Sequence, residues 1–146
     1  MTESSKIDFA ARRIREIGDI TDLIQVFFPG NRNQQHAAGR ILLALKAATQ
    51  PVPSLSYLED RYEISRRTLQ RTRAKLSKLG LIERISWMNS RYGGQEGWKL
   101  SSRMSTALRL LADKIDDWRK ENRSDRIEKE QTLVGLLSGT DISQGR

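Results

Sequence analysis

The residues best suited to chemistry in this chain are cationic and amide side chains between residues 65 and 82. This segment reads SRRTLQRTRAKLSKLGLI, with six Lys or Arg and no carboxylate between Glu63 and Glu83. Guanidinium and amide groups bind phosphates and the polar edges of bases, whereas a helix that only faces water usually mixes its charges. The segment therefore predicts a surface for an anionic partner.

A single helix is expected to position these groups. Ser65 can cap the first turn through its hydroxyl, and Gly80 can adopt the left-handed conformation that ends a helix. The residues expected on the buried side recur at steps of three and four: Leu69, Thr72, Leu76 and Leu79.

The opposite side of this helix carries the candidate base readers Arg67, Gln70 and Arg71. Arg suits the two acceptors of guanine, Gln suits the donor and acceptor of adenine, and Ala74 leaves room for close approach. The other polar groups are expected to meet the phosphate backbone: Ser65, Arg66, Thr68, Arg73, Lys75, Lys78, Arg84 and Lys99.

Two further elements flank the basic helix. A shorter helix capped by Ser54 ends at the tight connection Tyr62-Glu63-Ile64, which makes a helix-turn-helix in which Glu63 occupies a position that favours a left-handed backbone. After Gly80 the pattern changes to that of a β-hairpin, whose glycine-containing loop carries the contact candidates Arg91, Tyr92 and Gln95, with Arg91 aimed at a minor groove or phosphate. Trp87 and Trp98 flank this loop as a cross-strand packing pair, with base stacking as the alternative.

The outer parts of the chain are also expected to be helical. Residues 7–17 and 20–28 are amphipathic and either pad the core or form an arm exchanged with a second subunit. Residues 36–48 and 105–118 carry apolar stripes, and the charged segment after Trp118 is partly helical and then disordered. The terminal helices predict a homodimer, which would set two basic helices about one turn of DNA apart on a palindromic site.

The formal charge is +8, and it has a defined location. Residues 61–103 hold eleven Lys or Arg and three Glu, while the remainder holds fifteen of each sign. The basicity therefore belongs to one block, as expected for a nucleic-acid binder. With no Cys, one His, no phosphate-cradling GxxxxGK sequence and no acidic metal cluster, we expect no metal, cofactor, small-molecule ligand or enzyme activity. Asp113, Asp116 and Asp117 are read as a solvated helix face. The absence of a long apolar run predicts a soluble cytoplasmic protein, nucleoid-associated when bound to DNA.

The order helix, helix, basic helix, hairpin, helix resembles the winged helix-turn-helix family. ISRRTLQRTRAKLSKLGLIERI is similar to that family's recognition helix and strand entry, and RYGGQEGWKLS to its wing. The resemblance implies a mainly α fold with a small β-hairpin, divided into an N-terminal arm (1–35), the winged domain (36–118) and a C-terminal extension (119–146). Arg73 stands where the family often has an apolar residue, which leaves open whether Arg71 or Arg73 faces DNA.

The function expected from these features is sequence-specific binding of double-stranded DNA, as a transcriptional regulator acting as a dimer on an inverted repeat. Two alternatives remain open. One is a plasmid or phage replication or partition protein, and the other is a winged helix that binds only protein.

Overall fold

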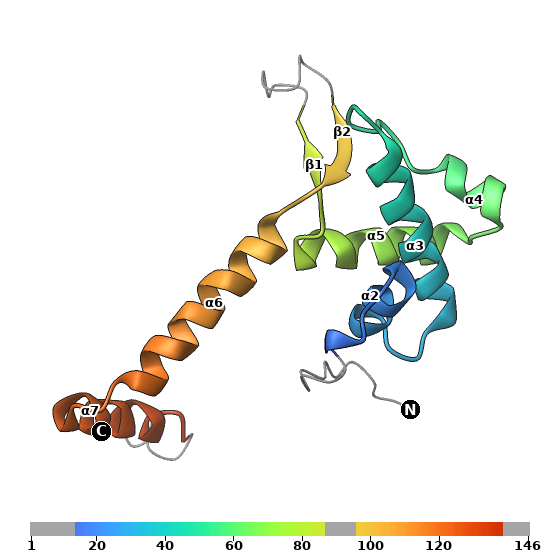
Figure 1. The fold of residues 1–146 in the computed structure, drawn as a ribbon. Helices are drawn as coiled ribbons and strands as arrows, with labels where there is room; N and C mark the ends of the chain where they lie inside the picture. The colour runs from blue at the N-terminus through green and yellow to red at the C-terminus, as the bar shows by residue number, and fades with distance from the viewer. Residues whose placement is uncertain (1–13, 87–95, 139–146) are drawn as a thin grey trace. The chain divides into compact units, whose positions relative to one another are not determined.

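The fold is mainly helical with one small antiparallel hairpin, in a computed structural model that describes residues 14–86 and 96–138 (Figure 1). The coarse fold class expected from the sequence is thereby confirmed. The chain divides into two compact units, Met1–Ser105 and Thr106–Arg146. No helix of the described residues is long and apolar enough to cross a membrane.

The first unit begins with α2 (Ile20–Phe27), which packs on α3 (Arg32–Ala47). Asp19 caps α2 by accepting hydrogen bonds from two first-turn amides, and Asn31 caps α3 by accepting one from the Gln34 amide. Ile24 and Phe28 are buried in the same core as α3, so α2 pads the core of its own chain. The expected domain boundary after residue 35 lies within α3, because that helix begins at Arg32.

Two helices and a tight connection follow: α4 (Tyr57–Tyr62) and α5 (Arg66–Leu79). Between them Glu63 adopts the left-handed conformation, with φ 55° and ψ 46°, as its place in the turn predicted. Ser65 caps α5 through its side chain, and Gly80 ends it with φ 89°. The sequence-based bounds of the basic helix are confirmed.

The hairpin joins β1 (Ile82–Ile85) and β2 (Gly97–Leu100), and its register sets Trp98 opposite Arg84. Val52 adds an unexpected second pairing on the other side of β2, because its amide and carbonyl exchange hydrogen bonds of 2.8 Å with the backbone of Trp98. The segment around Pro51 and Pro53, expected only to stop a helix, therefore anchors the hairpin to the core. Trp87, the expected partner of Trp98, lies outside the described residues.

The remaining helices are α6 (Arg103–Lys120), which begins in the first unit, and α7 (Ser124–Gly135) in the second. Neither helix has a buried residue. The expected boundary after residue 118 falls inside α6, close to its end.

Candidate nucleic-acid interface

The basic helix α5 is held against the core by the face that the sequence predicted. Leu69, Thr72 and Leu76 are fully buried, and α5 packs across α3 (Figure 1). Arg103 secures the C-terminal end of α5, since its guanidinium donates to the carbonyl oxygen of Ser77 at 2.7 Å. The helix is thus fixed at both its buried face and its end, and its outer face is presented as a rigid surface.

This outer face is a continuous polar stripe. Arg67, Gln70, Arg71, Ala74 and Lys78 are all exposed, and their spacing places them on one side of the helix over about three turns, or roughly 16 Å of its length. Among the described residues, none of the cations in this stripe forms an ion pair or a side-chain hydrogen bond. The charges of this stripe are therefore available to an external anion.

The neighbouring cation Arg73 is turned toward the protein. Its guanidinium lies over the ring of Trp98, 5.0 Å from the centroid, and the residue is half-buried. Arg84 approaches the same ring at 5.7 Å. Such cation–π contacts contribute roughly 0.5–1 kcal/mol at partly exposed sites. Of the two alternatives left open by the sequence, Arg71 is therefore the residue on the exposed side, and Arg73 links α5 to the hairpin.

Lys75, one of the predicted phosphate contacts, also has an intramolecular role in the structure. Its ammonium donates to the carbonyl oxygen of Phe27 at 2.6 Å and lies 4.5 Å from the ring centroid of Phe28. Phe27 is the last residue of α2, so this carbonyl lacks a helical partner and carries the negative end of the helix dipole. The Lys75 ammonium therefore supplies a hydrogen-bond donor to the last carbonyl of α2. Because it is engaged within the protein, Lys75 is not among the residues of the proposed interface.

The hairpin cations Arg84 and Lys99 are paired with carboxylates. Arg84 bonds Glu96, and the Lys99 ammonium lies 3.3 Å from a carboxylate oxygen of Glu83 and 2.8 Å from the carbonyl oxygen of Leu100. The Arg84–Glu96 pair is exposed, and pairs of this kind contribute only about 0–1 kcal/mol. Exchange of Glu96 for a phosphate at the exposed Arg84 would thus cost little free energy, whereas Lys99 is half-buried and held by contacts that include Glu83 and the Leu100 carbonyl.

The start of α5 combines a cap with polar groups. The Ser65 hydroxyl accepts from the Thr68 amide at 3.1 Å and donates to the Thr68 hydroxyl at 2.9 Å, so both of these predicted phosphate contacts also hold the first turn. Arg66, beside them, is exposed and has no carboxylate partner among the described residues. The loop candidates Arg91, Tyr92 and Gln95 lie outside the described residues.

Sequence reasoning missed two residues that position this surface. Val52 fixes the base of the hairpin and Arg103 fixes the end of α5, and both act through backbone carbonyls distant in sequence. No periodicity or spacing signals such contacts. The described residues contain no group of three or more His, Cys, Asp or Glu side chains placed to hold a metal ion.

Comparisons with protein-family models, with curated proteins and with solved structures gave no match for this chain.

Proposed function

We propose that this protein binds double-stranded DNA sequence-specifically through α5, in the manner of a winged helix-turn-helix domain. The observation that carries the proposal is the unpaired cationic stripe on a helix otherwise locked into the core. An α-helix that enters the major groove needs an exposed cationic face, and its opposite face must be packed against the rest of the domain. The element order α3, α4, α5, hairpin, α6 supports the same family.

Within this proposal the exposed residues divide by role. Arg67, Gln70 and Arg71 lie on consecutive turns of the stripe and read base edges, because their side chains can form paired hydrogen bonds with purines. Arg66 and Lys78 lie toward the two ends of α5 and contact phosphates, with Arg84 as a further contact from the hairpin. Lys75 and Arg73 hold α5 in place from the protein side.

The test begins with selection of bound fragments from random duplex DNA, followed by affinity measurements against salt. Arg67→Ala or Gln70→Ala should cost about 1–3 kcal/mol on the selected site and relax base preference there. Lys78→Ala should weaken binding to every sequence and reduce the magnitude of the salt slope by about one unit.

Lys114→Ala is a matched control, since it removes one exposed charge from the neutral second unit and should change neither quantity. The proposal fails when no sequence is enriched and affinity for duplex DNA does not depend on salt, which is the behaviour of a winged helix that binds only protein.

The selected site also assigns the biological role. A single inverted repeat beside a promoter indicates a transcriptional regulator, and an array of iterated repeats indicates a replication or partition protein. We propose the regulator as the principal function, because one short reading helix per chain suits a compact half-site.

A further inference from the structure

The second unit exposes an apolar surface that its own helices do not cover. Of its described residues 106–138, none is buried, and ten large apolar side chains are exposed, from 43% at Leu108 to 80% at Leu137. Helices of 18 and 12 residues are marginal in water without packing. The apolar faces of α6 and α7, whose packing normally supplies most of a helix's stability, are therefore left uncovered among the described residues.

The apolar residues of α6 have the spacing used for packing between helices. Leu108, Leu111, Ile115 and Trp118 follow one another at steps of three, four and three, which is the pattern of the two core positions of a heptad repeat. Such a stripe faces another helix at a small crossing angle. The partner is consequently helical over at least three turns.

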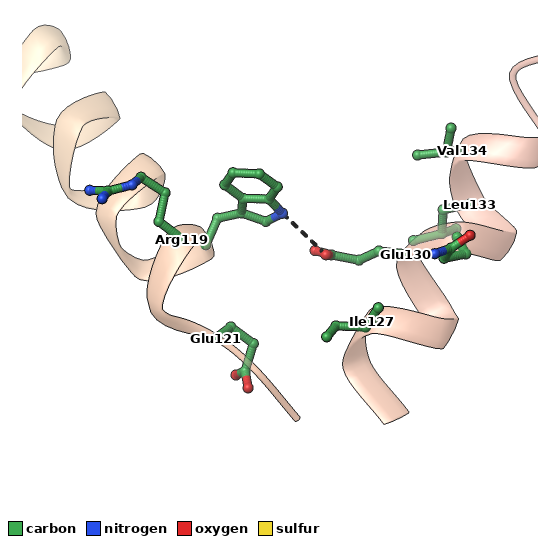
Figure 2. A pocket seen from close by; sticks show the side chains of 8 residues that line it. Arg119, Glu121, Ile127, Glu130, Leu133 and Val134 are labelled. Carbon is green, nitrogen blue, oxygen red and sulfur yellow. Dashed lines mark hydrogen bonds between the residues drawn. The ribbon is translucent and has the colours of Figure 1, made fainter. Parts of the chain in front are cut away.

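Helix α7 leaves a hollow beside the end of this stripe. The hollow is open to solvent and has a volume of about 780 Å³. Half of its lining residues are apolar, namely Trp118, Ile127, Leu133 and Val134, and the other half are polar, namely Arg119, Glu121, Glu130 and Gln131. Figure 2 shows Ile127, Glu130 and Leu133 facing the last turn of α6, with Glu130 accepting the 3.2 Å hydrogen bond from the Trp118 indole. A partly apolar hollow next to an apolar stripe on the same unit is an arrangement that two copies can fill reciprocally.

The exposed area matches what a dimer requires. Ten half-exposed side chains offer roughly 300–600 Å² of apolar surface per copy, taking about 60–120 Å² for each fully buried aliphatic side chain. A standard interface buries about 800 Å² on each partner, a little over half of it apolar. The exposed apolar area is therefore of the same size as the apolar part of one side of such an interface.

Charge favours a second copy as the partner. Residues 106–138 hold seven Lys or Arg and seven Asp or Glu, a net charge of zero, although the whole chain carries +8. Two such units do not repel each other, and they offer no net attraction to an anionic or cationic partner. Neutrality, heptad spacing and apolar area point to the same occupant.

We propose that α6 and α7 form a homodimer interface in which the Leu108–Trp118 stripe packs against the same two helices of a second copy. The interface is independent of DNA. Where the DNA-binding proposal also holds, the dimer presents two α5 helices to one duplex, and the preferred site is an inverted repeat.

The test is sedimentation equilibrium of the full chain without DNA. The wild type should be dimeric at low micromolar concentration, and Leu111→Glu should raise the dimer dissociation constant at least 100-fold. Leu43→Glu is the matched control, because Leu43 is a leucine of comparable exposure (46% against 55% for Leu111) on α3 of the first unit; it should leave the constant within about threefold. Leu111 is exposed within the chain, so the urea midpoint of the first unit should not change in its variant.

A chain without Cys permits a second measurement. A bismaleimide should cross-link Ile115→Cys into dimers far more than Leu43→Cys. The proposal is overturned by a wild type that stays monomeric up to about 100 µM, by a Leu111→Glu dimer as tight as the wild type, or by equal cross-linking of the two Cys variants. A monomer in which Ile115→Cys resists alkylation would instead assign the surface to another segment of the same chain. A monomer that still selects a DNA sequence removes the dimer alone and leaves the DNA-binding proposal standing.

Discussion

Replacing Thr72 with Val should stabilise the first unit. Thr72 is fully buried on the core face of α5, and its hydroxyl oxygen has no hydrogen-bond partner. Leaving a buried hydroxyl unsatisfied costs about 1–3 kcal/mol. Val has nearly the same shape and a similar helix propensity, and it buries a methyl group where the hydroxyl was. We expect a gain of about 1–2 kcal/mol, or roughly 5–15 °C in Tm for a unit of this size.

Urea unfolding followed by far-UV circular dichroism measures this change. The midpoint should rise while the m-value stays constant, because the surface exposed on unfolding is the same. Thr72→Ser keeps the hydroxyl and removes the methyl group, so it should lose about 1 kcal/mol. Thr68→Val on the same helix breaks the bond from the Ser65 hydroxyl and should lose about 0.5–1.5 kcal/mol. A Thr72→Val variant as stable as the wild type, or less stable, would show that the hydroxyl finds a partner in solution and refute the reasoning.

Three further predictions concern the backbone and the helix caps. Glu63→Gly should stabilise the protein by about 0.5–1 kcal/mol in urea unfolding, since Gly removes the left-handed strain at φ 55° at a smaller entropic cost. Gly97→Ala should destabilise it by about 2–4 kcal/mol in the same assay, because the new methyl group would lie 2.4 Å from the Val52 carbonyl oxygen at a backbone with φ 151°. The hydrogen bond from the Thr21 hydroxyl, followed by that from the Asp22 amide, lowers the pKa of Asp19. The contribution of Asp19 to the free energy of unfolding is therefore complete above the ordinary Asp pKa and is lost as pH falls through the lowered one. When unfolding is measured at decreasing pH, Asp19→Asn should not show this loss of stability.

The features that could be predicted from the sequence are those set by neighbouring residues. The bounds of α5 follow from a hydroxyl at Ser65 and a glycine at Gly80, and its buried face follows from the helical repeat. The left-handed turn at Glu63 follows from the short connection between two helices. Each of these features depends only on residues within a few positions of one another in the sequence.

Contacts between distant residues could not be predicted in this way. Lys75 contacts a carbonyl 48 residues earlier, and nothing in its own segment distinguishes it from Lys78, which is exposed. The pairing of Val52 with Trp98 likewise depends on how α3 and the hairpin meet. The stripe on α6 was recognised as apolar, but periodicity alone does not tell whether a stripe is covered by its own chain.

Like charges stand four residues apart on α5, which raises the question of why its outer face is cationic. Arg67 and Arg71 are four residues apart, as are Arg71 and Lys75, and like charges at this spacing destabilise a helix by about 0.2–0.5 kcal/mol per pair. The chain offsets this cost on the protein-facing side, where Arg73 meets Trp98 and Lys75 meets the end of α2. On the outer side, no such partner for Arg67 or Arg71 is found among the described residues. A helix selected only for stability would place a carboxylate at one of these positions, so the uncompensated repulsion argues that the outer face is kept for an anion from outside the chain.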